Sequence, residues 1–264
     1  MAKRNKLRPM KFASWNVNSI RVRLPQVLGW LATEQPDVLC LQETKVPDEE
    51  FPFEALREAG YESIANGQRT YNGVAIVSRT PPTNVIREVA TVDNEQKRVL
   101  AASYNGVRII NVYVPNGSEV GSEKYAYKLG WFAGLKSWLA SELKRSERLL
   151  ILGDFNVAPE DRDVYDPEGW RGSVLVSDAE RAALQELMDL GLIDVFRRFD
   201  QPEESYSWWD YRAAGFRRNH GLRIDLILCN PAMASRCRKT WIDKGPRQLE
   251  RPSDHAPVIA EFGV

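Results

Sequence analysis

The sequence has little of what disulfide-linked, zinc-binding or membrane proteins need. Its three cysteines, Cys40, Cys229 and Cys237, include no CxxC pair, and only two histidines are available to join them. We therefore expect small buried thiols in a reducing cytoplasm rather than a disulfide framework or a zinc site. No apolar run approaches the roughly 18 residues of a membrane span, and no signal peptide follows the basic start, so no membrane partner is expected.

Net charge is also absent, because 36 basic side chains balance 36 acidic ones, and the total predicts no polyanionic partner. The charge is nevertheless unevenly placed. Residues 31–62 hold nine acids against Lys45 and Arg57, whereas residues 212–251 hold ten basic residues against three acids. Clustered basic charge is typical of a phosphate-backbone binder and also of a solvated surface, so charge alone leaves both open.

Short segments rich in Val, Ile and Leu recur between Gly, Pro, Asn and Asp, as β-strands do. They span 11–17, 37–42, 73–78, 98–104, 107–114, 148–153, 222–229 and 256–262. Helical patterns lie between them: one with Pro25 in its first turn, a long amphipathic one over 122–143, and one capped by Asp178. Successive strands over 79–114 indicate antiparallel pairing. The sequence thus predicts an α/β fold of two packed mixed sheets with helices outside.

The chain shows no flexible linker that would divide it. We therefore predict a single domain over residues 10–264, preceded by a flexible tail over residues 1–9. That tail carries Lys3, Arg4, Lys6 and Arg8 and no acid. It either adds non-specific phosphate contacts or is a spectator.

Polar side chains stand at the ends of several predicted strands. They are Asn16, Glu43, Asp154, Asn156, Asp225 and the pair Asp254-His255. One acid at a strand end is usually a cap, but loops from several strands converge where layered folds bind ligands. The functional interpretation therefore holds only if these segments meet at one rim.

The chemical types of these residues form a coherent set. Carboxylate and amide oxygens suit a hard cation such as Mg²⁺, which Mn²⁺ can replace, and the set contains no thiolate for zinc. An Asp-His pair supplies an imidazole, and a further Asp can orient or deprotonate water. Such an inventory is typical of metal-assisted attack of water on a phosphodiester. His220, outside any such string, is expected to be structural.

Seven segments together resemble the exonuclease III family, which includes the apurinic/apyrimidinic (AP) endonucleases, of the endonuclease/exonuclease/phosphatase superfamily. They are SWNVNSIR, DVLCLQETK, YNGVAIVS, NVYVPNG, LILGDFNVAPEDRDV, YSWWDYR…GLRIDLIL and SDHAPV. They run in order from Met10 to Val264. The resemblance implies a four-layered αββα sandwich with two mixed sheets, in agreement with the strand and helix pattern.

The resemblance also implies roles for the strand-end residues. It makes Glu43 the main Mg²⁺ carboxylate, with Asn16 beside it and Asp254 assisting. Further residues would act on the phosphate: Tyr113 contacts it, Asp154 positions or deprotonates the attacking water, Asn156 holds a non-bridging oxygen, Asp225 orders the network, and His255, oriented by Asp254, stabilises developing charge. Whether one or two metal ions take part stays open.

A second group of residues is implied to bind double-stranded DNA with abasic sites or blocked 3′ ends. Trp208, Leu222 and Ile224 would wall a pocket for a flipped, base-less sugar. Phosphate contacts would come from Arg212, Arg217, Arg218 and Arg223, and backbone contacts from Tyr71, Asn72 and Gly73. The expected enzyme is a DNA repair phosphodiesterase that cuts 5′ to abasic sites and trims 3′ ends, acting as a cytoplasmic monomer.

One loop, residues 161–172, weakens the analogy, because bulky Trp170 and Arg171 would border the abasic pocket. If they fill it, abasic-site cleavage falls while 3′-end trimming survives, and Arg171→Gly should raise cleavage. Three rival functions stay open: a phosphatase on a non-nucleic phosphoester, an RNA nuclease, and a catalytically dead nucleic-acid-binding protein. The presence of Glu43, Asp154 and His255 counts against the last.

Overall fold

The strands and helices follow the chain much as the sequence predicts, in a computed structural model that describes residues 9–263. The strands are β1 (Met10–Asn16), β2 (Val38–Gln42), β3 (Glu62–Asn66), β4 (Val74–Ser78), β5 (Thr83–Ile86), β6 (Val99–Tyr104), β7 (Val107–Tyr113), β8 (Leu149–Asp154), β9 (Ile193–Asp194), β10 (Asp225–Cys229), β11 (Cys237–Ile242) and β12 (Val258–Phe262). The α-helices are α1 (Ile20–Glu34), α2 (Phe53–Glu58), α3 (Glu123–Arg145), α4 (Pro167–Trp170), α5 (Asp178–Met188), α6 (Gly215–Arg218) and α7 (Pro231–Ala234).

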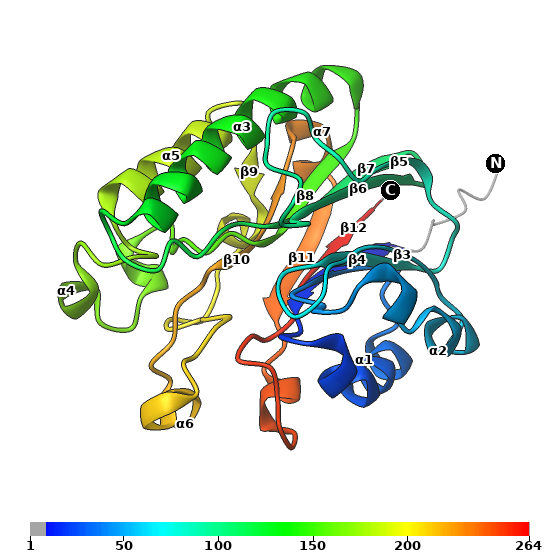
Figure 1. Cartoon of the computed structure of the whole chain (residues 1–264), viewed down its shortest axis with the longest axis horizontal. Helices are drawn as coiled ribbons and strands as arrows, with labels where there is room; N and C mark the ends of the chain where they lie inside the picture. The colour runs from blue at the N-terminus through cyan, green and yellow to red at the C-terminus, as the bar shows by residue number, and fades with distance from the viewer. Residues whose placement is uncertain (1–8, 264) are drawn as a thin grey trace, which may run out of the picture.

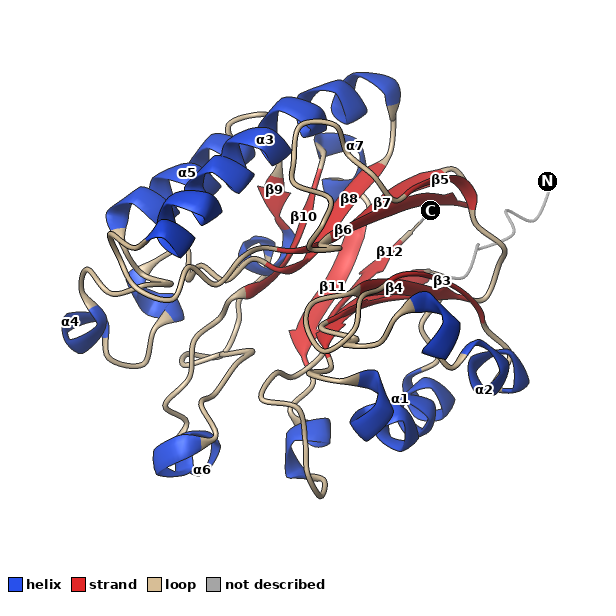
Figure 2. Ribbon diagram, in the orientation of Figure 1, coloured by secondary structure: helices blue, strands red, loops and turns tan. Residues whose placement is uncertain are grey.

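Two six-stranded sheets face each other at the centre of the molecule (Figures 1 and 2). Their strand orders are β11-β12-β1-β2-β4-β3 and β5-β6-β7-β8-β10-β9. Each contains one parallel pair, β1 with β2 and β7 with β8, and is antiparallel elsewhere. Helices α1 and α2 cover the first sheet and α3 and α5 the second. The prediction of a four-layered αββα sandwich is confirmed.

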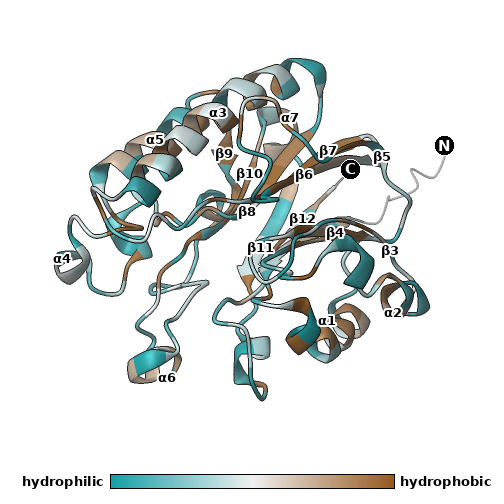
Figure 3. Cartoon of the chain, in the orientation of Figure 1, coloured by the Kyte–Doolittle hydropathy of each residue, from teal (hydrophilic) through white to brown (hydrophobic). Residues whose placement is uncertain are grey.

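Alternation along the strands builds three apolar layers, because successive side chains point to opposite faces of a sheet. In β1, Phe12 faces the core between the sheets while Ala13 faces α1. In β6, Leu100 joins the same central core and Ala101 packs toward α3. Figure 3 shows brown, hydrophobic stretches along strands such as β6 and β7, whereas helix α3 is mainly pale and teal. These layers hold the ends of both sheets in fixed relative positions.

Two helix boundaries differ from the prediction. Pro25 lies inside α1 rather than in its first turn. Its ring faces solvent, where water can satisfy the Arg21 carbonyl that the missing N–H leaves free. Ser177, rather than Asp178, caps α5: its side chain accepts from the Glu180 amide, and the Glu180 side chain reaches back. The long helix over 122–143 is confirmed as α3, with Ser122 as its cap.

The predicted tail over residues 1–9 lies almost wholly outside the described residues. Within residues 9–263, no helix is long and apolar enough to cross a membrane. Cys40 and Cys229 are buried, Cys237 is half-buried, and all three are free thiols.

Candidate active site

The polar strand ends meet at one edge of the sandwich. Helix α1 carries the chain from β1 to the parallel strand β2, and α3 carries it from β7 to β8, so all four carboxyl ends lie together. Asn16 ends β1, Glu43 follows β2, and Tyr113 pairs in register with Asp154. Asp225 starts β10 opposite Asp154. The condition for the functional interpretation is therefore met, and we call these residues together with His255 the catalytic floor.

Two carboxylates of the floor are joined by one amide. The Nδ2 of Asn16 donates to Oε1 of Glu43 at 2.8 Å and to Oδ2 of Asp154 at 2.9 Å. The Tyr113 hydroxyl also hydrogen-bonds with Glu43, and Lys45 Nζ lies 2.9 Å from Glu43 Oε2. Burial, followed by the charge of Glu43, raises the pKa of Tyr113 well above its ordinary value. Tyr113 is therefore a neutral donor at every physiological pH.

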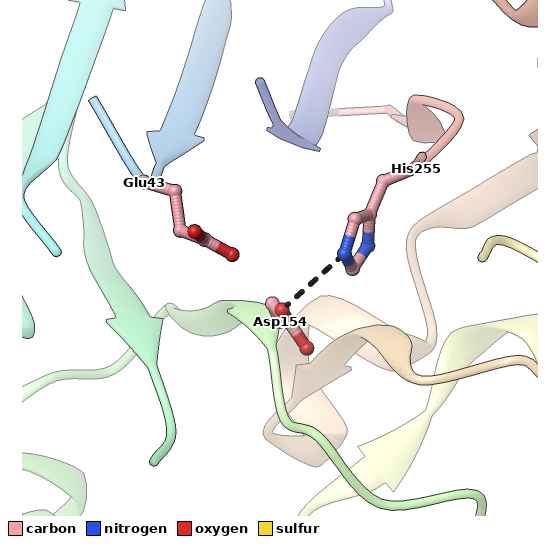
Figure 4. Close-up of side chains that lie close together, drawn as sticks. All are labelled: Glu43, Asp154 and His255. Atoms are coloured by element: carbon pink, nitrogen blue, oxygen red, sulfur yellow. Dashed lines mark ion pairs between the residues drawn. The ribbon is translucent and has the colours of Figure 1, made fainter. Parts of the chain in front are cut away.

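His255 takes its orientation from Asp225. Its Nδ1 lies 2.8 Å from Oδ2 of Asp225, and the same oxygen accepts from Ser207 Oγ at 2.7 Å. Its Nε2 faces Oδ2 of Asp154 at 3.7 Å, as the dashed line in Figure 4 shows. The expectation that Asp254 orients His255 is wrong, because Asp225 occupies the ring nitrogen. This arrangement is consistent with the expected role of Asp225 in ordering the network.

The protonation states follow from this packing. Burial raises the pKa of Asp154 to about 7, against the opposing charge of His255. Burial acts to lower the pKa of His255, but the carboxylates of Asp225 and Asp154 outweigh it and raise that pKa to about 10. At neutral pH the ring is therefore an imidazolium, while Asp154 is poised between its acid and its base form.

Asp254 belongs to a second network next to the floor. Its oxygens accept from Trp208 Nε1 and from Asn18 Nδ2, both at 3.0 Å. Burial acts to raise the pKa of Asp254, but His255 and these donors lower it overall. Asp254 therefore carries a charge that anchors Trp208, and no oxygen of it belongs to the cluster described next.

One group of described side chains could hold a metal ion. Ligand atoms of Glu43, Asp154 and His255 all lie within 4.8 Å of one another (Figure 4). His255 is an imidazolium whose Nδ1 is taken by Asp225, which leaves the two carboxylates as the candidate ligands. Two nearby carboxylates with one amide between them present several oxygen donors, the ligand type that a hard divalent cation prefers.

Asn156 turns back beside the floor with a left-handed φ of 50°. Its backbone amide donates to Asp154 Oδ1 at 2.9 Å, and its Nδ2 donates to the Val114 carbonyl. Asn116 Nδ2 donates to Asn156 Oδ1 at 3.2 Å, so two side-chain amides lie together next to Asp154.

The sequence is similar to those of known proteins, and this similarity identifies the family of the chain. The model of the endonuclease/exonuclease/phosphatase family matches residues 13–255. This chain belongs to that family. Exodeoxyribonuclease III of Haemophilus influenzae is 39% identical, with 96% of this chain and 100% of that protein aligned. The predicted family and the class of hydrolytic DNA nuclease are confirmed.

Two solved structures of family members are similar over nearly the whole chain. The 3′ phosphatase NExo from Neisseria, bound to a product DNA hairpin, is 49% identical with a TM-score of 0.94, over 96% of this chain and 99% of that one. An AP endonuclease from Archaeoglobus fulgidus is 39% identical with a TM-score of 0.93, over 97% and 100%. The family likeness therefore extends to members with two different substrates.

Beside the floor, the segments 161–172 and 206–224 form what we call the recognition rim. Leu222 and Ile224 are buried there, at 0% and 1% exposure, and Trp208 packs against them. Trp170 packs against the same cluster and meets Trp208 edge-on, with ring centroids 6.5 Å apart. The predicted walls of the sugar pocket are thus in contact with the loop over residues 161–172.

The side chains of Trp170 and Arg171 lie in different surroundings, although both were expected to border the abasic pocket. Arg171 is exposed and lies 2.5 Å from Glu168 on the outer side of the loop. The expectation that Arg171 helps to fill the pocket is wrong, because its side chain points to solvent. Of the two, Trp170 is the residue that packs against the cluster containing Leu222 and Ile224.

The four arginines of the rim differ in exposure to solvent. Arg212, Arg217 and Arg218 are exposed, and Arg212 pairs with Asp210. Arg223 is buried, contacting Asp163 and, through Nη1, Asp194 at 2.8 Å. Burial acts to lower the pKa of Arg223, but the two carboxylates raise it above its ordinary value. The expected phosphate contact of Arg223 is therefore wrong in this fold.

Tyr71, Asn72 and Gly73 lie on the opposite side of the floor. Tyr71 is 68% exposed, and the carbonyl of Asn72 accepts from the Lys45 amide at 2.9 Å, which places this loop beside Glu43. Gly73 has a φ of 86°, and a Cβ there would lie 2.3 Å from Thr44 Oγ1. Only glycine fits this approach.

Four residues at the site were not predicted: Asn18, Lys45, Asn116 and Ser207. Asn18 and Lys45 stand in the motifs SWNVNSIR and DVLCLQETK, and Asn116 in NVYVPNG. Their place in those strings was the available signal. Ser207 likewise stands in YSWWDYR, but its role depends on a hydrogen bond to Asp225 that only the fold creates.

Proposed function

We propose that the chain is a Mg²⁺-dependent DNA phosphodiesterase that acts mainly at 3′ ends, as exonuclease and 3′-phosphatase, with little cleavage at internal abasic sites. The observation that carries the proposal is the convergence of Glu43, Asp154 and His255 on one floor beside a rim that Trp170 closes. We also propose that it works in the cytoplasm as a monomer on double-stranded DNA.

The cation would be held mainly by Glu43, whose carboxylate oxygens suit Mg²⁺, or Mn²⁺ in its place, with Asp154 next to it. Its chemistry there is to neutralise charge on the phosphoryl oxygens. The Asn16 amide, which now joins the two carboxylates, would keep them the same distance apart. Asp254, held by Trp208 and Asn18, would add negative charge behind the site without contacting the ion directly.

The remaining residues supply the proton transfer and the charge stabilisation. Asp154, with a pKa of about 7, accepts a proton from the attacking water. The His255 imidazolium, together with Tyr113 and the amides of Asn116 and Asn156, stabilises negative charge on the phosphoryl oxygens. Exposed Tyr71, Arg212, Arg217 and Arg218 would contact the DNA backbone.

Preference for 3′ ends is supported by the packing of the rim. A flipped sugar needs apolar surface, yet Leu222 and Ile224 are 0% and 1% exposed within the cluster against which Trp208 and Trp170 pack. A 3′-terminal phosphate reaches the floor without entering that pocket. The 3′ phosphatase from Neisseria, at 49% identity, also supports this preference.

The test uses two labelled duplexes, one with an internal abasic-site analogue and one with a recessed 3′-phosphate, each with Mg²⁺ and with EDTA. We expect Mg²⁺-dependent removal of the 3′-phosphate with the abasic strand left intact. Trp170→Gly should then allow cleavage at the abasic site, whereas the neighbouring Arg171→Gly should not. Equal gains from both variants, or none from Trp170→Gly, would contradict the closed pocket.

A second candidate is an AP endonuclease, which the Archaeoglobus structure favours at 39% identity. Efficient wild-type incision 5′ to the abasic site would establish it and would mean that Trp170 moves aside for substrate. If neither duplex is cleaved, DNA phosphodiesterase activity is refuted, and RNA and inositol phosphates become the substrates to test.

A further inference from the structure

Lys128 on α3 is a buried cation that lies behind the catalytic floor. It is fully buried, and its Nζ donates to the Asn156 carbonyl at 2.6 Å, to the Asn116 carbonyl at 3.0 Å and to the Glu180 carboxylate. A lysine ammonium has three N–H donors, so each of them has one acceptor. The side chain therefore reaches from the outer helix layer to the two asparagines beside Asp154.

Glu180 at the start of α5 is equally buried and equally well satisfied. Its oxygens accept from the backbone amides of Leu175 and Ser177, at 3.0 and 3.2 Å, and from Ser177 Oγ. Burial acts to lower the pKa of Lys128, and Glu180 opposes that change. The pair thus fixes one point on α3, one on α5 and two backbone carbonyls next to the floor.

We propose that Lys128, held by Glu180, is a positioning residue that aims the side-chain amides of Asn116 and Asn156 at the scissile phosphate. Drawing both carbonyls toward the helix layer leaves the two side chains on the floor, where Asn116 Nδ2 meets Asn156 Oδ1. Asn156 is held at two more points, since its backbone amide donates to Asp154 Oδ1 and its Nδ2 donates to the Val114 carbonyl. The inference rests on the proposed function, in which these amides contact a phosphoryl oxygen.

Stability alone is a weak explanation for this pair. Burying two charges carries a desolvation penalty that apolar side chains of similar volume avoid, and replacing such a pair is often neutral or stabilising. What an apolar pair cannot do is bind two carbonyls at defined positions. The geometry therefore favours a role in the alignment of the floor.

A matched control exists on the same two helices. Lys136 on α3 pairs with Glu186 on α5 at 2.9 Å, with both side chains exposed and no contact to the floor. The double variant Lys136→Met/Glu186→Gln removes the same residue types and the same link between the helices. Its effect measures what the loss of an interhelical ion pair does by itself.

The experiment compares Lys128→Met/Glu180→Gln with this control on the 3′-phosphate duplex, after circular dichroism has shown both to be folded. We expect kcat to fall about 10- to 100-fold with KM nearly unchanged, because a group that aims other residues acts on the reaction rather than on binding. Wild-type kcat in the folded double variant, with or without a lower melting temperature, would overturn the proposal.

A double-mutant cycle with Asn156→Ala shows whether Lys128 acts through that side chain. Once the Asn156 amide is gone, loss of the Lys128–Glu180 pair should reduce kcat by a smaller factor than in the wild-type background. Independent, multiplicative losses would refute action through Asn156. If the neutral pair fails to fold, Glu180→Asp keeps both charges but shortens the acceptor, and an unchanged kcat in that variant would equally overturn the proposal.

Failure of this inference is distinguishable from failure of the proposed function. Inactive wild-type protein would refute the function, whereas active wild type and control beside an unimpaired Lys128 double variant would refute the inference alone.

Discussion

The catalytic floor and the recognition rim lie side by side but are built in different ways. The residues of the floor lie at strand ends. Backbone hydrogen bonding between neighbouring strands fixes their register, as in the pairing of Tyr113 with Asp154. The rim is made of loops whose shape depends on side-chain packing, such as Trp170 against Trp208. The groups proposed to act on the phosphate are therefore positioned by sheet geometry, whereas the proposed preference for 3′ ends rests on a few loop contacts.

The largest effect should come from the buried anchor of the rim. Arg223→Met leaves Asp163 and Asp194 without the guanidinium that they share. We expect the free energy of unfolding to fall by about 3–5 kcal/mol, as it does when one partner of a buried ion pair is removed. Urea denaturation measures the loss, with exposed Arg217→Met as the control. Equal stability of both variants would mean that the rim has no rigid anchor.

Loss of a floor carboxylate should abolish turnover and spare binding. Glu43→Ala and Asp154→Asn each remove a group that acts on the reacting phosphate, and loss of one such group typically raises the barrier by about 2.7–4 kcal/mol. Single-turnover rates and DNA affinity are measured together. Activity of either variant within tenfold of wild type would contradict the assignment of the floor.

A smaller change is expected when only the partner of His255 is altered. In Asp225→Asn the pKa of His255 should fall from about 10 by about one to three units, because the carboxylate that raises it most is gone. An NMR titration of the ring proton measures the shift. In the wild type, the folded-state pKa lies above the ordinary value of 6.5, so this charge stabilises the fold fully below 6.5 and ceases to do so as the pH rises through 10. An unchanged pKa of His255 in this variant would contradict the conclusion that the Asp225 carboxylate raises it.

The smallest effect should belong to the exposed part of the rim. Arg217→Ala removes one phosphate contact, so the slope of log affinity against log salt should decrease by about one with stability unchanged. Fluorescence anisotropy at several salt concentrations gives the slope, and Lys136→Ala on the outer helix is the control. An unchanged slope would place the DNA elsewhere on the surface.

Much of the floor could be predicted because it depends on strand ends. The β-branched segments located β1, β2, β7, β8 and β10 to within a few residues, and polar residues at their ends marked the site. The start of α1 was predicted wrongly because proline favours the first turn of a helix. Nothing in the local sequence shows that Pro25 lies on the solvent side of α1, where the unpaired carbonyl can bind water.

The rest depended on contacts between residues far apart in the chain. Arg223 looks like its exposed neighbours in sequence, and only the fold brings Asp163 and Asp194 to it. Asp254 precedes His255 directly, yet Asp225 reaches the imidazole. Lys128 sat in an amphipathic helix as an ordinary polar residue. Sequence patterns give the direction of a side chain along one element but not its partner on another.

Strand β12 is last among the described strands but lies inside its sheet, between β11 and β1. During synthesis from the amino end, β1 therefore has only β2 beside it until the final strand leaves the ribosome. His255 arrives just ahead of that strand, and Trp15 Nε1 then donates to its carbonyl. The central position of β12 thus links completion of this sheet to assembly of the floor, because His255 lies directly before the strand that completes it.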